Sequence, residues 1–335
     1  MAGTSTGAGA AHRLRLAVTL GDPRGIGPEV AADAARHART LPHPPELVFV
    51  GPEGTAADAV EVAAFHAVGR WDGSGDPARA GALAGRAIEA AAAMALDRAV
   101  DAIVTAPIDK SALHAAGYRY PGHTEMLAAL AGQRRGTAPL PVAMMMVAEE
   151  TALGGALRVV LATTHLALRA VPDALSVPLL VEQARLAAEG LRRGWGLARP
   201  RIALCAVNPH ASDGGLFGDE EARIVTPARD ALRADGIDAA GPIPADTVFV
   251  RAIRGEFDAV VAPYHDVGMA AFKTAAFGRG VNLTLGLPFI RTSPDHGTAL
   301  DIAGRGLADP ASMIEALALA MRLARHGGAA PTSEA

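Results

Sequence analysis

The chain has 335 residues, half of them hydrophobic and a fifth charged, and its net charge is −4. At about 150 residues per domain this predicts a globular protein of about two domains, and it excludes a disordered or collagen-like chain. Because the sequence has no basic stripe and no apolar run of about 18 residues, we expect neither a nucleic-acid partner nor a membrane-spanning helix. The lone Cys205 excludes an internal disulfide. The opening residues also lack the apolar segment of a signal peptide, so we expect a cytoplasmic location.

Short β-branched runs alternate with alanine-rich helical patterns along the chain. The expected strands cover residues 15–20, 46–50, 102–105, 142–147, 158–163, 202–207, 259–262 and 281–285. The expected helices cover residues 28–39, 78–97, 124–131, 173–193, 219–235, 245–254 and 310–325. This alternation is typical of an α/β fold with a mostly parallel sheet and helices on both faces. A short link through Gly155 joins two of the strands, which predicts a hairpin and therefore a mixed sheet.

Three of the apolar runs end in a histidine: His165, His210 and His265. Ligands of open α/β sheets bind beyond the carboxyl ends of parallel strands, so we expect these imidazoles at one edge. Neutral imidazole is the commonest metal ligand, and three protein ligands leave a position open for a substrate oxygen. Histidines this far apart do not form a local metal motif, so the alternative that each is a loop residue bonded to nearby backbone stays open.

A second group of candidates suits an anionic ligand. Residues 122–125, Gly-His-Thr-Glu, enter a predicted helix with Thr124 as the candidate cap, and backbone N–H groups at a helix start favour anions. Lys273, Asn282 and Arg291 are long-reach donors that suit a small, multiply anionic substrate. Lys110 follows another strand. A plain capped helix and solvated surface residues would explain the same patterns without a ligand.

The glycine-rich loop at residues 21–29 follows the first strand and opens a helix. Its glycines are spaced G-x-x-x-G-x-G, which differs from the G-x-G-x-x-G of Rossmann dinucleotide sites. A dinucleotide cofactor therefore does not follow from this loop, and capping of the helix by Pro28 is its default explanation.

Several long motifs are specific to one family. They are GDPRGIGPE, TAPIDK, GHTE, NPHASDGGLFGDEE, GPIPADTVF, YHD and FGRGVNLTLGLPFIRTSPDHGTALDIAG, and they lie between about residue 15 and residue 325. Together they closely resemble the 4-hydroxythreonine-4-phosphate dehydrogenase family of pyridoxal phosphate (vitamin B6) biosynthesis.

The resemblance implies a two-lobed α/β fold like that of isocitrate and isopropylmalate dehydrogenases, and a homodimer with the active site at the interface. We expect residues 13–135 and 286–326 to form lobe 1, and residues 136–285 to form lobe 2 with the metal and dimer elements. Residues 1–12 and 327–335 are expected to be a disordered leader and tail.

The resemblance also implies a set of site residues. A divalent metal (Zn, Mg or Co) is expected on His165 and His210 of one subunit and His265 of the other. The implied substrate contacts are His123, Thr124, Lys273, Asn282 and Arg291. The expected catalytic and orienting residues are Lys273, Asp246 and Asp266, the two aspartates acting on the metal-binding histidines.

The implied reaction uses NAD or NADP to oxidise the secondary alcohol of 4-phosphooxy-L-threonine. The resulting β-keto acid loses carbon dioxide and gives 3-amino-2-oxopropyl phosphate. One departure leaves the substrate open, because Val267 follows Tyr-His-Asp where a glutamine is expected. A paralogous dehydrogenase would act on 4-phospho-threonate or -erythronate, or on a carboxylated cyclohexadiene diol. A non-redox metal-dependent transferase or lyase, and a non-catalytic binding protein, also stay open.

Overall fold

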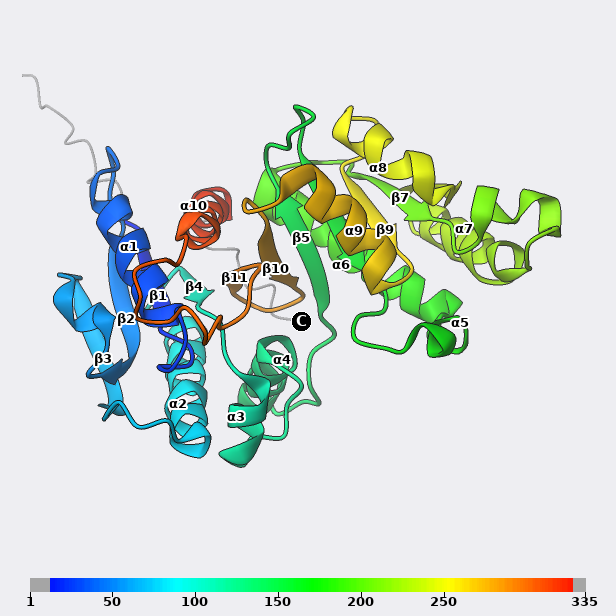
Figure 1. The fold of residues 1–335 in the computed structure, drawn as a ribbon. Coiled ribbons are helices and arrows are strands. Elements are labelled where there is room, and N and C mark those ends of the chain that lie inside the picture. The colour runs from blue at the N-terminus through cyan, green and yellow to red at the C-terminus, as the bar shows by residue number, and fades with distance from the viewer. Residues whose placement is uncertain (1–12, 328–335) are drawn as a thin grey trace, which may run out of the picture.

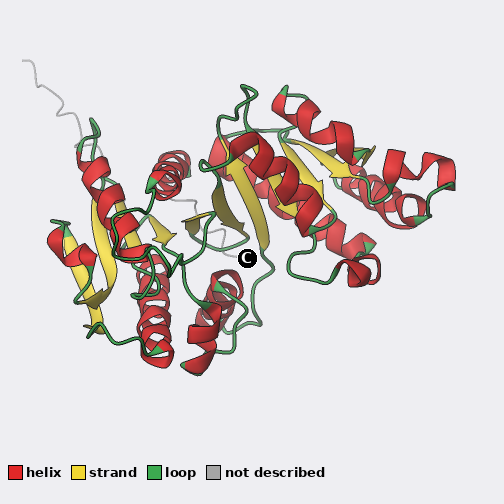
Figure 2. Cartoon of the chain, in the orientation of Figure 1, coloured by secondary structure: helices red, strands yellow, loops and turns green. Residues whose placement is uncertain are grey.

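A computed structural model describes residues 13–327, which form an 11-stranded mixed sheet with helices on both faces (Figures 1 and 2). The strands are β1 (Arg15–Thr19), β2 (Glu46–Glu53), β3 (Ala64–Arg70), β4 (Ala102–Thr105), β5 (Ala143–Ala148), β6 (Leu157–Leu161), β7 (Arg201–Cys205), β8 (Asp238–Ile243), β9 (Ala259–Ala262), β10 (Val281–Leu285) and β11 (Ile290–Pro294). The expected leader at 1–12, and the expected tail beyond its first residue, lie outside the described residues.

The helices alternate with these strands along most of the chain. They are α1 (Gly27–Arg39), α2 (Pro77–Leu96), α3 (Lys110–Ala115), α4 (His123–Arg134), α5 (Val171–Ala174), α6 (Val177–Trp195), α7 (Thr226–Ala234), α8 (Ala245–Ile253), α9 (His265–Ala276) and α10 (Ala311–His326). No helix within residues 13–327 combines the length and the apolar character needed to cross a membrane.

The strand order is β3-β2-β1-β4-β11-β10-β5-β6-β9-β7-β8. The first five strands are parallel to one another, and so are the last four. The central strands β10 and β5 pair antiparallel with each other and with their outer neighbours β11 and β6. The two parallel blocks therefore run in opposite directions, and β10 and β5 separate them in the middle of the sheet. The hairpin predicted between β5 and β6 is confirmed.

Both faces of each block are covered because alternate residues of a strand point to opposite sides. In the first block Ala17 and Ile103 pack towards α2, whereas Leu16 and Val104 pack in a different core with α1 and α10. In the second block the helices α6 and α7 cover one face, and α8 and α9 cover the other. Burial on both faces explains why most of these strands are continuous apolar runs in the sequence.

Five elements escaped the sequence prediction: β3, β8, β11, α3 and α9. Strand β3 lies at the sheet edge and is mostly exposed, so it lacks an apolar run. Strand β8 contains a Gly-Pro pair, and β11 is a buried but polar Ile-Arg-Thr-Ser-Pro strand. Helix α9 begins at His265 itself, so this histidine opens a helix. The proposed division into two lobes stays a prediction.

Candidate functional site

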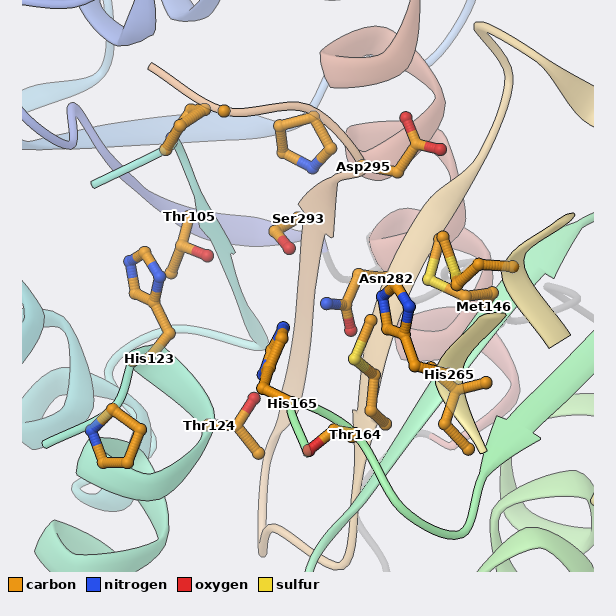
Figure 3. A pocket seen from close by; sticks show the side chains of 18 of the residues that line it. Thr105, His123, Thr124, Met146, Thr164, His165, His265, Asn282, Ser293 and Asp295 are labelled. Carbon is orange, nitrogen blue, oxygen red and sulfur yellow. The ribbon is translucent and has the colours of Figure 1, made fainter. Parts of the chain in front are cut away.

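A cavity of about 680 Å³ lies at the central strands β10 and β5, between the two parallel blocks (Figure 3). Its walls come from β4, β5, β10 and β11, and from the starts of α4 and α9. Seven of the predicted site residues line it: His123, Thr124, His165, His265, Lys273, Asn282 and Arg291.

Arg291 is a buried cation in the wall of this cavity. Its side chain lies on β11, and the residue is only 3% exposed. The guanidinium donates from Nε and Nη2 to the Thr105 hydroxyl at 3.0 and 2.7 Å, and from Nη1 to the Thr284 hydroxyl at 3.0 Å. Burial lowers the pKa of Arg291 to about 10, so it is still positively charged at neutral pH. Because both hydrogen-bond partners are neutral, an anion in the cavity would stabilise this charge.

Two polar atoms beside Arg291 lack hydrogen-bond partners within residues 13–327. They are Nε2 of His123 and Oδ1 of Asn282, and both are buried. Buried polar atoms of folded proteins are almost always paired, so unpaired ones at a cavity indicate the place of a ligand. Burial, followed by the charges of Arg291 and Lys110, lowers the pKa of His123 well below its ordinary value. His123 is therefore neutral at physiological pH.

His165 and His265 come together at the end of the second block. Strands β6 and β9 are neighbours in the sheet, and the two imidazoles follow them with their ring centroids 5.7 Å apart. Burial lowers the pKa of His165, and the charges of Lys110 and His265 lower it further. This favours the neutral imidazole that binds a metal. Asp266 Oδ1 lies 2.8 Å from His265 Nδ1, which is the contact that an orienting carboxylate needs.

His210 lies apart from the other two histidines in the chain. It sits in the segment Pro209–Gly215 after β7, its ring is 6.5 Å from that of Phe217, and it does not line the cavity. The described residues hold no group of three His, Cys, Asp or Glu side chains that could bind a metal. The expected set, His165 and His210 of one subunit with His265 of the other, stays a prediction; within one chain it is His165 and His265 that lie close together, because β6 adjoins β9. Asp246 is exposed on α8 and also lies outside the cavity lining.

Some lining residues were missed by the sequence reasoning. Thr105, Ser293 and Asp295 line the cavity, and Lys273 Nζ donates to the Asp295 carbonyl at 3.3 Å, with the carboxylate at 3.6 Å. Two of these lie on β11 or directly after it, so missing that strand hid them. The only signal for Thr105 was its place at the end of a predicted strand.

A second cavity of about 520 Å³ lies beside the glycine-rich loop at residues 21–29. Arg24 lines it and is held by Asp22 at 2.7 Å and by Asp109 at 3.1 Å. Glu29 Oε1 and Ser74 Oγ are buried lining atoms without hydrogen-bond partners in the described part of the chain. The segment 295–304 connects the two cavities, because its start lines the first and its end lines the second.

Comparison with known proteins settles the family. The family model described as "Pyridoxal phosphate biosynthetic protein PdxA" matches residues 58–320. The chain belongs to this family. A PdxA relative from Methylorubrum populi, named 4-hydroxythreonine-4-phosphate dehydrogenase, is 45% identical over 93% of this chain and 95% of its own length. The crystal structure of the enzyme of that name from Klebsiella pneumoniae is 41% identical, with a TM-score of 0.80 over 93% of this chain and all of its own.

Two further solved structures bear on the substrate and on the fold. A terephthalate 1,2-cis-dihydrodiol dehydrogenase from Burkholderia xenovorans is 29% identical, with a TM-score of 0.61 over 93% of this chain and 98% of its own. An isocitrate dehydrogenase from Methylococcus capsulatus is 17% identical with a TM-score of 0.50, covering 93% and 88%. The second likeness concerns the fold alone. The family and the fold class predicted from the sequence motifs are thus confirmed.

Proposed function

We propose that this PdxA-family chain is a metal-dependent 4-hydroxythreonine-4-phosphate dehydrogenase. It would oxidise the secondary alcohol of 4-phosphooxy-L-threonine with NAD or NADP, and the product would lose carbon dioxide to give 3-amino-2-oxopropyl phosphate. One observation carries the proposal: the cavity places the buried Arg291, whose hydrogen-bond partners are hydroxyls, within the same walls as two close imidazoles. A cation for an anionic group and ligands for a metal are the two features that this substrate class requires.

The anionic groups of the substrate would be held by the cations of the cavity. Arg291 offers a planar guanidinium, and Lys110 and Lys273 offer point charges in the same walls. The unpartnered atoms of His123 and Asn282 provide polar contacts nearby. A small substrate with two anionic groups, a phosphate and a carboxylate, would pair with more of these cations than a substrate with one anionic group.

A divalent metal fits the donors at the other end of the cavity. His165 and His265 would supply two neutral imidazoles, and we assign the third ligand to His210 of a second copy of the chain. When bound, the metal would act as a Lewis acid towards the oxygen of the reacting alcohol. Asp266 would hold the His265 ring through Nδ1 and leave Nε2 for the metal.

The proposed homodimer has support on the surface of the chain. Exposed apolar side chains flank two of the histidines: Leu166 and Leu168 follow His165 and are 49% and 67% exposed. Leu216 and Phe217 follow His210 and are 73% and 46% exposed. Apolar surface of this kind favours a protein partner. A second copy would cover it and complete the set of three histidines.

Lys273 is the residue that we assign to proton handling. NAD or NADP, when bound, would supply the acceptor for the hydride of the alcohol, and the hydroxyl proton would pass to a base. Loss of carbon dioxide would then leave the C–C electron pair as an enolate, with negative charge on the former ketone oxygen. A cation beside that oxygen lowers the energy of the developing charge. Lys273 Nζ, positioned by Asp295, would then supply the proton that the product carbon takes up.

The rest of the dinucleotide would occupy the second cavity. The segment 295–304 reaches both cavities, so a cofactor with its nicotinamide in the first would extend along this segment into the second. The unpartnered Glu29 and Ser74 oxygens there would accept hydrogen bonds from it. The cytoplasmic location expected from the sequence stays a prediction.

A second candidate is oxidation of a carboxylated cyclohexadiene diol. The departure at Val267 and the likeness to the Burkholderia xenovorans dehydrogenase favour it. Turnover of 4-phosphooxy-L-threonine, of 4-phospho-threonate and of the diol, measured by NAD(P) reduction with added Co²⁺, Mg²⁺ or Zn²⁺, would rank the three. We expect the phosphorylated amino acid to have the largest kcat/KM and a chelator to abolish turnover. Activity on the diol alone would reject the main proposal, and turnover without a pyridine nucleotide would indicate a non-redox transferase or lyase.

A further inference from the structure

The segment that carries His210 has an unusual backbone. Residues His210, Ala211, Ser212, Asp213 and Gly214 have φ angles of 53°, 56°, 68°, 44° and 70°. Four of the five are not glycine, and L side chains rarely adopt this left-handed region even singly. A run of this kind persists only where contacts from outside the segment hold it.

A single buried carboxylate provides those contacts. Glu221, which is 4% exposed, accepts the backbone N–H groups of Val207 and Asn208 on Oε1 at 2.8 and 2.7 Å. Its Oε2 accepts the Asn208 side-chain amide at 2.9 Å and also the Ser212 hydroxyl. The carboxylate thus binds the chain just before the left-handed turn and again in its middle. Asn208 is bound a second time by Glu220, at 2.7 Å.

The carboxylate is held in its ionised form. Burial opposes ionisation, but the hydrogen bonds from Asn208 and Ser212 outweigh it and lower the pKa of Glu221. Charge-assisted hydrogen bonds of this kind are stronger than neutral ones. These contacts of Glu221 with Val207, Asn208 and Ser212, which we call the clamp, therefore persist at neutral pH.

The turn leaves His210 at the surface of its own chain. His210 is exposed and lies outside the cavity of its own subunit, beside the exposed Leu216 and Phe217. The buried Glu221 holds a strained turn, and this turn carries an exposed imidazole. Such an arrangement is explained if the imidazole acts outside its own subunit. Strain of this kind is concentrated at functional sites.

We propose that Glu221 is a positioning residue, which holds the left-handed turn through Asn208 and Ser212 so that His210 reaches the metal site of a second copy. This rests on the proposed function, because it takes His210 as the third metal ligand. Glu221 touches neither substrate nor metal and acts only through the backbone that carries the imidazole. Loss of the Glu221 carboxylate should therefore reduce the affinity of the site for the metal.

The test is a thermodynamic cycle on the full-length protein with Co²⁺ as the probe. Titration of the metal-free protein with Co²⁺, followed by calorimetry, is done for the wild type, Glu221→Gln, His210→Ala and the double variant. We expect Glu221→Gln to weaken Co²⁺ binding about 10- to 100-fold, the range found for residues that orient metal ligands. In the His210→Ala background the same change should weaken it no further.

Matched variants separate positioning from a general loss of stability. Glu189→Gln removes an exposed carboxylate of α6 and should leave Co²⁺ binding unchanged. Ser212→Ala removes one clamp contact and should give a smaller effect, which keeps the proposal testable if Glu221→Gln does not fold. Ala211→Gly relieves the backbone strain and should recover part of the affinity lost in Glu221→Gln.

The possible results distinguish a failure of this inference from a failure of the proposed metal site. If Glu221→Gln lowers the thermal midpoint but leaves Co²⁺ affinity unchanged, the clamp is only structural and the inference is wrong while the proposed function stands. Equal losses of affinity with and without His210 would overturn it in the same way. If His210→Ala itself leaves Co²⁺ affinity unchanged, His210 is not a ligand, and both the inference and the metal assignment fail.

Discussion

Two buried arginines of this chain are held in opposite ways. Arg158, whose side chain is 11% exposed, pairs with Glu149 at 3.3 Å and lies 4.8 Å above the Trp195 ring. Glu149 also accepts a hydrogen bond from Trp195 Nε1 at 3.1 Å and forms an ion pair with Arg322 at 2.6 Å. Arg291 is buried at least as deeply, yet its partners are the hydroxyls of Thr105 and Thr284.

The difference separates a structural charge from a functional one. A buried cation with its own carboxylate is compensated within the fold, so its removal leaves an opposite charge unpaired. A buried cation whose hydrogen-bond partners are hydroxyls, and which faces a cavity, is stabilised further when an anion binds there. Burial of the Arg291 charge therefore lowers the stability of the free protein, and binding of an anionic substrate would offset that loss. Substitutions at the two arginine sites, and an added anion, test this contrast.

Removal of the functional cation should affect activity rather than stability. We expect Arg291→Met to lower kcat/KM for the phosphorylated substrate by about 10²- to 10³-fold, because an anion-binding donor is lost. The thermal midpoint should change little, since the hydrogen-bond partners of Arg291 are neutral hydroxyls. Steady-state kinetics and calorimetric unfolding check both parts. A fall in stability with activity retained would reverse our assignment.

Removal of the structural carboxylate should do the opposite. Glu149→Gln takes away the charge that pairs with Arg158 and Arg322, and we expect a loss of about 1–3 kcal/mol in the free energy of unfolding. We expect kcat/KM to change by less than about threefold, which corresponds to a change of under about 0.7 kcal/mol in the activation free energy. Denaturant unfolding measures the first quantity. The contrast would be broken if this variant lost as much activity as Arg291→Met.

An anion alone should distinguish the two sites. Inorganic phosphate at about ten times its dissociation constant should stabilise the wild type by about 1.4 kcal/mol, because it binds only the folded state. Glu149→Gln should gain the same increment, and Arg291→Met should gain none. Thermal unfolding with and without phosphate, at matched ionic strength, measures it. Stabilisation of Arg291→Met by phosphate would place the anion elsewhere in the chain.

The hydroxyl that orients Arg291 should matter less than the cation itself. Thr105 accepts two of its hydrogen bonds, so Thr105→Val should lower kcat/KM about 10-fold, mainly through KM. Thr105→Ser keeps the hydroxyl and is the matched control, which should stay within about twofold of the wild type. Equal effects of the two substitutions would show that shape, rather than the hydrogen bonds, is what Thr105 supplies.

The pH dependence of the free energy of unfolding tests the single electrostatic interaction between Arg291 and His123, and we expect the smallest effect there. Burial and Arg291 hold the pKa of His123 below its ordinary value. The unfolded chain therefore takes up this proton first, and stability should fall as pH drops below about 6.5. His123→Asn should flatten that fall. In Arg291→Met the pKa of His123, followed by NMR, should rise, and an unchanged value would remove Arg291 as a cause.

Much of the fold was predictable because local patterns match the sheet. The runs at 102–105 and 259–262 are almost wholly apolar, the run at 281–285 alternates apolar with polar residues, and the structure has strands with the same bounds. Prediction failed where a strand lacks that pattern. Strand β3 has an exposed edge, and β11 carries a buried Arg291 whose environment is made by other strands. A polar residue in a strand indicates an exposed position unless its distant partners are known.

By itself the sequence determined the chemistry available to this protein: which imidazoles, cations and amides follow the strands, and to which family its motifs belong. The tertiary structure decided which of them meet. Because β6 adjoins β9, the rings of His165 and His265 lie 5.7 Å apart while His210 lies outside the cavity, and because β11 pairs with β4, Arg291 donates to the hydroxyl of Thr105, which is 186 residues distant. Strand pairing at long range depends on how whole faces of helices and sheet bury one another, and no local run of residues encodes that.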